Sequence, residues 1–360
     1  WATAVSEPAG RTYSRVIFVS NGGLQLHRVT LSESTRYSSV TAALIDTLLL
    51  LGGLALLIKG ADLLVSGASS IAGRLGVSAL VIGLTVVSFG TSLPEMLVTL
   101  VSGLRQNSDL AIANVIGSNI ANVLLVLGIA AIIRPLPVKD STVVSEIPFS
   151  LTAALLVGFL ANAALFSSHT ELSISRLDGG ILLFFFALFI LYVYKISRNG
   201  EHLSNDNPSN LPASRSVLYI VLGVVALYVG GGWVVDGAVG LARLINVDDA
   251  LIGLTIVAIG TSSPEIVASA VAAYRNQTDI AVGNVVGSNI FNLLWVLGLT
   301  SSLVELPFEV VNNTDLVMVI CSSALIIFAL VASRNNSILR SHGIVFIVLY
   351  AGYLYYVTTR

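Results

Sequence analysis

Residues 83–95 read GLTVVSFGTSLPE, and residues 253–265 read GLTIVAIGTSSPE. Both stretches continue in the same register, into NVIGSNIANVLLVLG and NVVGSNIFNLLWVLG respectively. The offset is 170 residues throughout, and an ungapped comparison of 81–128 with 251–298 gives 25 identities in 48 positions. Two apolar segments that are each interrupted by Gly and Pro, and that each carry one Glu, are typical of the binding site of a transporter.

The composition indicates a membrane protein. Of the 360 residues, 55% are hydrophobic and only 11% are charged, whereas soluble domains carry about 25% charged residues. The apolar residues form runs of about 20, enough to cross a bilayer as a helix. The net charge of −2 gives no support to a nucleic-acid partner, and the single Cys excludes an intrachain disulfide. The sequence therefore predicts an all-α polytopic protein whose apolar surface faces the lipid bilayer.

The chain divides into a polar extension and ten apolar spans. Residues 1–40 contain no continuous apolar run, and their composition predicts a disordered N-terminal extension. We expect ten transmembrane helices in the remainder, at 42–71, 77–101, 109–133, 147–166, 174–196, 216–243, 250–273, 279–304, 315–333 and 340–358.

A polar linker at 198–215 separates two five-helix repeats, 41–197 and 216–360. Because five is an odd number, the second repeat must enter the membrane from the opposite side, and the two repeats are expected to be inverted copies. With the N-terminus outside, the loops expected to be cytoplasmic hold nine Lys or Arg residues and the external loops hold three. This bias favours an external N-terminus, a cytoplasmic linker and a cytoplasmic Arg275, with Arg105 outside.

Glu95 and Glu265 are equivalent acids inside apolar spans. A charge at mid-membrane costs roughly 2.5–3.5 kcal/mol on insertion scales, so an intramembrane acid indicates a functional site. Pro94 cannot donate a backbone hydrogen bond and disfavours helix at the residue before it, which predicts a break near 88–93 and free carbonyls there. The hydroxyl-bearing residues that precede the two acids are expected on their face of the helix; they are Thr91, Ser92, Thr261 and Ser262.

The following span of each repeat carries a polar stripe at i, i+4 and i+8. These stripes are Asn114, Ser118 and Asn122 in the first repeat, and Asn284, Ser288 and Asn292 in the second. One alternative is that the Asn side chains only hold helices together. Together, the acids, hydroxyls, amides and carbonyls offer an all-oxygen site, and Ca²⁺ prefers about 6–8 oxygen ligands. The same two carboxylates could instead hold Na⁺ ions or protons.

At GTSLPE…NVIGSNIAN and GTSSPE…NVVGSNIFN the sequence closely resembles the cation/Ca²⁺ exchanger superfamily, and above all its prokaryotic sodium/calcium exchanger members. The resemblance implies ion sites at mid-membrane with Glu95 and Glu265 as the central acids. It implies further ligands from the hydroxyls of Thr91, Ser92, Ser118, Thr261, Ser262 and Ser288, the carbonyls of Ser88 and Ala258, and Asn122. Asn292 is a departure, because some relatives carry Asp at this position.

The resemblance implies a secondary antiporter of a prokaryotic plasma membrane that exports Ca²⁺ in exchange for Na⁺ by alternating access. The two long helices at 42–71 and 216–243 are then expected to slide against the other eight. We expect no enzymatic activity, no cofactor and no obligatory protein partner. Two alternatives stay open: coupling to H⁺ or K⁺ on the same fold, which the neutral Asn292 makes credible, and a passive cation channel.

Overall fold

The computed structural model describes most of the chain. The described residues are 4–6, 12–20, 23–30, 33–139, 142, 144–163, 172–199, 211–245, 258–333 and 335–359. Within them, seven helices are long and apolar enough to cross a membrane, and one further span is a bent pair of helices. A shorter apolar helix, α8 (Glu146–Ala161), corresponds to the expected span at 147–166. The expected span at 250–273 lies partly outside the described residues, so the count of ten stays a prediction.

The helices of the first half follow the expected order. The expected span at 77–101 is divided into several short helical segments, and the π-helical turn η2 interrupts the span at 109–133. The elements are α1 (Glu33–Leu75), α2 (Ala79–Ile82), η1 (Gly83–Val87), α3 (Ser88–Thr91), α4 (Leu93–Leu104), α5 (Ser108–Ala121), η2 (Asn122–Val126), α6 (Leu127–Ile133), α8 and α9 (Arg176–Asn199).

The second half repeats this pattern. Its elements are α10 (Ala213–Leu244), α12 (Ala258–Thr261), α13 (Ser263–Tyr274), α14 (Thr278–Ile290), η5 (Phe291–Val296), α15 (Leu297–Leu303), α16 (Asn312–Ala332) and α17 (Arg340–Thr359). The bounds of α13 and α15 are those of α4 and α6 shifted by 170 residues. Even the left-handed turns recur, since Gln106 has φ 60° and Asn276 has φ 63°. The sequence duplication is therefore also a duplication of backbone structure.

Short antiparallel strand pairs tie the two halves together. Strand β4 (Leu136–Pro137) of the first half pairs with β7 (Ser337–Ile338) of the second. Strand β5 (Ser173–Ile174) of the first half pairs with β6 (Leu306–Pro307) of the second. Each half thus gives one strand to each pair, which is the exchange expected of two copies related by a two-fold axis.

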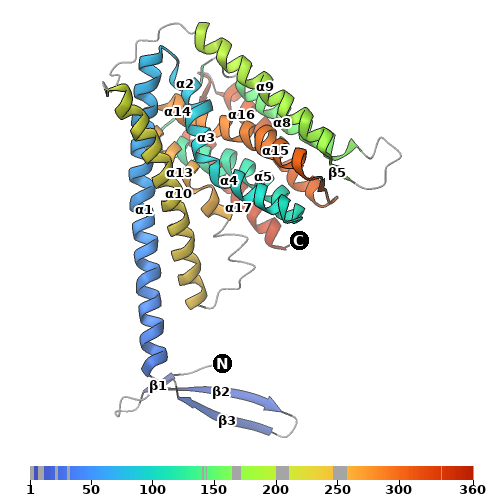
Figure 1. Ribbon diagram of the computed structural model, residues 1–360. Helices are drawn as coiled ribbons and strands as arrows, with labels where there is room; N and C mark the ends of the chain where they lie inside the picture. Colours follow the sequence, from blue (N-terminus) through green and yellow to red (C-terminus); the bar gives the residue numbers. More distant parts are fainter. Residues whose placement is uncertain are drawn as a thin grey trace.

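The N-terminal stretch differs from the expectation of disorder. Three strands form an antiparallel sheet there, namely β1 (Ala4–Ser6), β2 (Thr12–Ser20) and β3 (Gly23–Thr30). Helix α1 begins at Glu33, nine residues before the expected span, and it extends well past the other helices toward this sheet (Figure 1). The reason is that β2 reads TYSRVIFVS, a run rich in the β-branched and aromatic residues that favour strands, whereas the expectation of disorder rested on overall composition.

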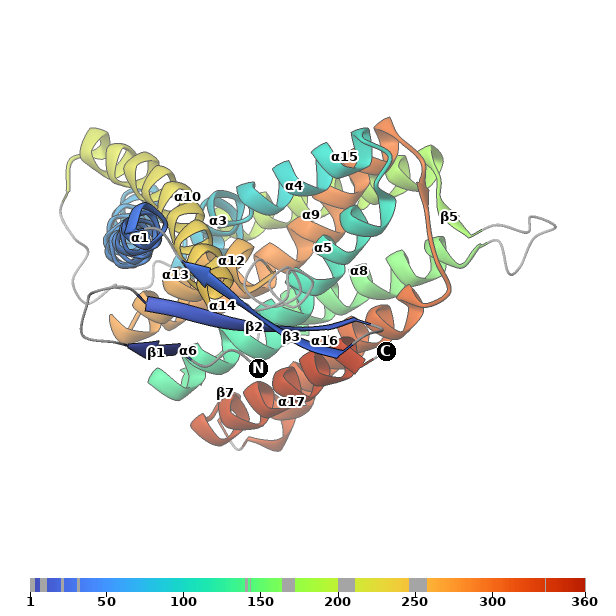
Figure 2. The ribbon, with the colours of Figure 1, turned by 90° about the horizontal axis from the view of Figure 1, so that it is seen from below.

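Helices α1 and α10 pack side by side over much of their length, on one side of the remaining helices (Figures 1 and 2). Glycines allow this close approach. A Cβ added at Gly53 would lie 2.8 Å from the Gly230 carbonyl oxygen, and one added at Gly230 would lie 2.9 Å from the Gly53 carbonyl oxygen. The most buried spans are α5–α6 and α14–α15, which form the centre of the helical core.

We predict that Gly230→Ala lowers the midpoint of thermal unfolding in detergent, because the added methyl would force the backbones of α1 and α10 apart. Gly232→Ala is the matched control, since nothing lies within 4 Å of a Cβ there. In a helix, Ala is more favourable than Gly by up to about 1 kcal/mol, so the control should be neutral or slightly stabilised. Equal midpoints of thermal unfolding for the two variants would contradict the close contact between α1 and α10.

Candidate ion-binding site

Each of the two equivalent acids, Glu95 and Glu265, lies one turn after a break between two helices. In the first half, α3 ends at Thr91, α4 begins at Leu93, and the segments on either side are bent by 49°. The break between α12 and α13, at Ser262, has almost the same backbone angles as the one at Ser92. The predicted break near 88–93 is confirmed, but it is narrower than expected. Pro94 stands in the first turn of α4, where its missing N–H is tolerated.

The carbonyls at the break are only partly free. The Ser88 carbonyl accepts the Ser92 N–H at 3.0 Å and lies 3.3 Å from the Thr91 hydroxyl, so its role as an ion ligand stays a prediction. The Gly90 carbonyl has Pro94 four residues later and cannot receive the usual helical hydrogen bond. Ala258, the other expected carbonyl ligand, is the first residue of α12.

Hydrogen bonds cross between the halves at the two acids. The Ser92 hydroxyl donates to Glu265 Oε1 at 3.1 Å, and the Ser262 hydroxyl donates to Glu95 Oε1 at 3.5 Å. All four residues are buried, with at most 3% of their surface exposed. Helical spacing predicts that each hydroxyl accompanies the acid of its own half. In the structure the two Ser hydroxyls instead donate to the acid of the other half, which brings the two carboxylates into one cluster.

A layer of amides supports this cluster. The Thr91 hydroxyl donates to Asn284 Oδ1 at 3.1 Å, and Asn284 Nδ2 donates to the Ser269 hydroxyl at 2.9 Å. In the first half, Asn114 Nδ2 donates to the Thr99 hydroxyl at 2.8 Å and to the Glu95 carbonyl at 3.1 Å. The Asn114 and Asn284 side chains therefore hold neighbouring helices in register, which agrees with the alternative that they join helices.

Thr99 and Ser269 were missed by the sequence reasoning. Both are buried hydroxyls, and they occupy equivalent positions at the 170-residue offset. That duplication is the signal that could have revealed them, because each stands four residues after the acid of its half.

Several buried polar atoms of the two acids and of nearby side chains have no hydrogen-bond partner within the described residues. They are Glu95 Oε2, Glu265 Oε2, the Ser288 hydroxyl and both side-chain polar atoms of Asn122 and Asn292. The two Asn residues lie in the π-helical turns η2 and η5, a distortion frequent at functional sites. Turn η2 packs against α13, which carries Glu265, and η5 packs against α4, which carries Glu95. Ser118 is buried on α5, and Thr261 ends α12.

This arrangement suits a hard cation. Buried polar atoms without partners are rare and call for an explanation. Apart from the two amide nitrogens, the ones here are carboxylate, amide and hydroxyl oxygens, with no sulfur or imidazole. Within the described part of the chain, no group of three or more His, Cys, Asp or Glu side chains could hold a metal. Two carboxylates completed by neutral oxygens match the oxygen ligands that Ca²⁺ takes.

Comparison with known proteins decides the family. The sequence pattern of the family described as sodium/calcium exchanger protein matches residues 45–195 and 215–359. The chain belongs to the sodium/calcium exchanger family. The resemblance drawn from the two repeats is therefore confirmed. Members of this exchanger family are membrane transporters of cations and not enzymes.

Three relatives match nearly their full length. The inner membrane protein YrbG of Escherichia coli is 37% identical, covering 81% of this chain and 90% of YrbG. The sodium/calcium exchanger MaX1 of Methanosarcina acetivorans is 32% identical, and the match covers 86% of this chain and 97% of MaX1. A solved structure of the sodium-calcium exchanger NCX_Mj, soaked with Na⁺ and Ca²⁺, is 35% identical and has a TM-score of 0.70, covering 85% of this chain and 96% of its own.

For this exchanger we predict that Glu95→Gln and Glu265→Gln each weaken Ca²⁺ binding by about 100-fold or more, since a charge pair at ~4 Å is worth several kcal/mol at low effective dielectric. Isothermal calorimetry on the purified protein measures this. Glu146→Gln is the control, because Glu146 on α8 is equally buried and, like the two site acids, has one hydrogen-bonded oxygen and one without a partner among the described residues. Its partner is Tyr192 of α9, a helix that carries none of the proposed ligands. Unchanged Ca²⁺ affinity in both site variants would overturn the assignment.

Proposed function

We propose that this chain is a secondary-active antiporter that exports Ca²⁺ in exchange for Na⁺ by alternating access. The observation that carries the proposal is the pair of hydrogen bonds from Ser92 to Glu265 and from Ser262 to Glu95. Because each acid is tied to the other half, the two carboxylates form one shared cluster. An ion held there contacts both halves, so its binding and release are coupled to their relative movement.

The charge of the cluster supports exchange over passive conduction. Two ionised carboxylates balance one Ca²⁺ or two monovalent cations. Leaving both ionised and without a cation inside protein costs several kcal/mol per charge. The site therefore favours release of one ion type only when another replaces it, which is the physical basis of antiport. The central ligands we propose are Glu95 and Glu265, supported by Thr91, Ser92, Ser118, Asn122, Thr261, Ser262, Ser288 and Asn292 and by the carbonyls of Ser88 and Ala258.

Asn292 favours a second candidate, with H⁺ or K⁺ as the coupling ion. Its side chain is fully buried and its polar atoms have no partner within the described residues. A neutral amide there supplies an oxygen ligand but no charge. The site then holds one negative charge fewer than relatives with Asp, and it has less electrostatic attraction for additional Na⁺.

Ca²⁺ uptake into proteoliposomes, driven separately by Na⁺, K⁺ and H⁺ gradients, tests the function. We expect uptake of Ca²⁺ when the vesicles are loaded with Na⁺ and diluted into Na⁺-free medium. Uptake driven by a pH gradient without Na⁺ selects the second candidate. Flux that follows only the Ca²⁺ gradient, with no dependence on a counter-ion, identifies a channel and contradicts both.

The charge of the cluster also predicts the effect of Asn292→Asp. The added carboxylate should raise the apparent affinity for Na⁺ by about tenfold, because a third negative charge close to the site stabilises a bound cation by more than 1 kcal/mol. The measurement is the Na⁺ dependence of Ca²⁺ flux in the same vesicles. An unchanged or weakened Na⁺ dependence would show that position 292 does not contribute to the cation site.

A further inference from the structure

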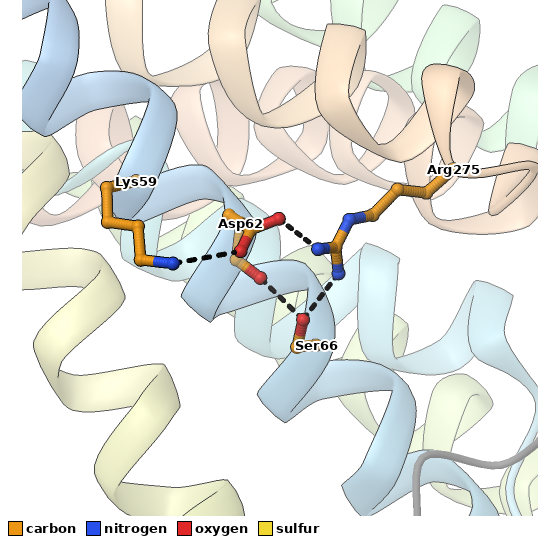
Figure 3. Close-up of polar contacts among 4 residues, drawn as sticks. All are labelled: Lys59, Asp62, Ser66 and Arg275. Carbon is orange, nitrogen blue, oxygen red and sulfur yellow. Dashed lines mark hydrogen bonds and ion pairs between the residues drawn. The ribbon is translucent and has the colours of Figure 1, made fainter.

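One ion pair joins the long helix α1 to the core. Arg275, the residue that follows α13, forms an ion pair with Asp62 of α1, and its Nη1 also donates to the Ser66 hydroxyl at 2.5 Å (Figure 3). Asp62 has a second cation, Lys59, at 3.5 Å on its own helix. The Arg275 contact is the only one of these cationic contacts that crosses between α1 and the core.

The equivalent contact in the other half is absent within the described residues. Subtracting 170 from Arg275 gives Arg105, the residue after α4, and adding 170 to Ser66 gives Asp236 of α10. Asp62 itself corresponds to Gly232, so the contact compared is the one between Arg275 and Ser66. Arg105 and Asp236 are both exposed, and no ion pair joins either of them to another described residue. Helix α1 packs extensively on α13, whereas the fully described α4 has no comparable packing against α1 or α10. Duplicated parts thus occupy two different states.

We propose that Arg275–Asp62 and Arg105–Asp236 are alternating clamps, one closed in each of the two states of the exchanger. The inference rests on the proposed alternating access. Two equivalent halves exchange their arrangements when the ion site changes from being open on one side of the membrane to being open on the other. In the opposite state α10 then packs on α4 as α1 packs on α13 here, and that packing brings Asp236 to Arg105.

The chemistry of the second clamp is complementary. The core supplies an Arg at both ends, and each long helix supplies an acid: Asp62 in α1 and Asp236 in α10. Position 236 corresponds to Ser66, which Arg275 already contacts, so an Arg105 placed like Arg275 would lie beside Asp236, while Gly232 takes the place of Asp62. Asp236 therefore replaces a hydroxyl acceptor with a charged one, and charge-assisted hydrogen bonds are roughly twice as strong as neutral ones. Each clamp stabilises closure at its own end of the molecule.

Cysteine cross-linking tests the clamps without a transport assay. In a background in which the single cysteine is replaced, Cys321→Ser, the pair D62C/R275C and the pair R105C/D236C are treated with a short bifunctional maleimide. We expect both pairs to cross-link, with opposite responses when Ca²⁺ or Na⁺ shifts the population. Absence of an R105C/D236C cross-link under every ion condition, while D62C/R275C reacts, would overturn the proposal.

Charge reversal in proteoliposomes gives a second measurement. We expect Arg105→Glu to slow exchange about fivefold, the scale of a partly exposed ion pair, and the double variant R105E/D236R to restore it. Lys59→Ala is the control, because it removes an ion pair within α1 only, and it should leave the rate unchanged. Failure of the double variant to recover would contradict the clamp. Absence of exchange in the unaltered protein would contradict the proposed function, while the cross-links would still decide the clamp.

Discussion

The structure depends on two carboxylates enclosed in protein and shared between two copies of one motif. Each acid is hydrogen bonded to a Ser of the opposite half, from Ser92 to Glu265 and from Ser262 to Glu95. Neither half could build this cluster alone, because each supplies the donor for the acid of the other. The duplication of the sequence therefore builds the cluster. In the proposed function it places two acids where one cation would bridge them and where leaving them without a cation is costly.

The other features of the fold serve this cluster. Pro94 and the break at Ser92 point a hydroxyl away from its own acid and across to the other half. The π-helical turns bring Asn122 and Asn292 to the same region, and the Asn284 amide fixes the distance between α14 and the break. The glycine contact lets the long helices α1 and α10 pack closely against each other beside the core. Helix α1 packs on α13, but α10 does not pack comparably on α4, and this asymmetry distinguishes two otherwise equivalent halves.

Much of this follows from the sequence. The 170-residue offset predicted the duplicated backbone, and the Gly and Pro around Glu95 predicted the break. The exchange of hydroxyls between halves could not be predicted, because spacing along one helix says nothing about which helix packs opposite. The π-helical turns and the Arg275–Asp62 pair also depend on tertiary packing. The strands at 4–30 were missed because composition, averaged over forty residues, hides the local run of β-branched and aromatic side chains in β2.

The most direct test of one shared site is a crystal structure with Ca²⁺ bound, in which anomalous scattering locates the ion. A shared site predicts one peak with an oxygen of Glu95 and an oxygen of Glu265 both within about 2.3–2.6 Å, the usual range for Ca²⁺ ligands. A peak held by only one of the two acids, or one that lies outside the interface of the two halves, would contradict it.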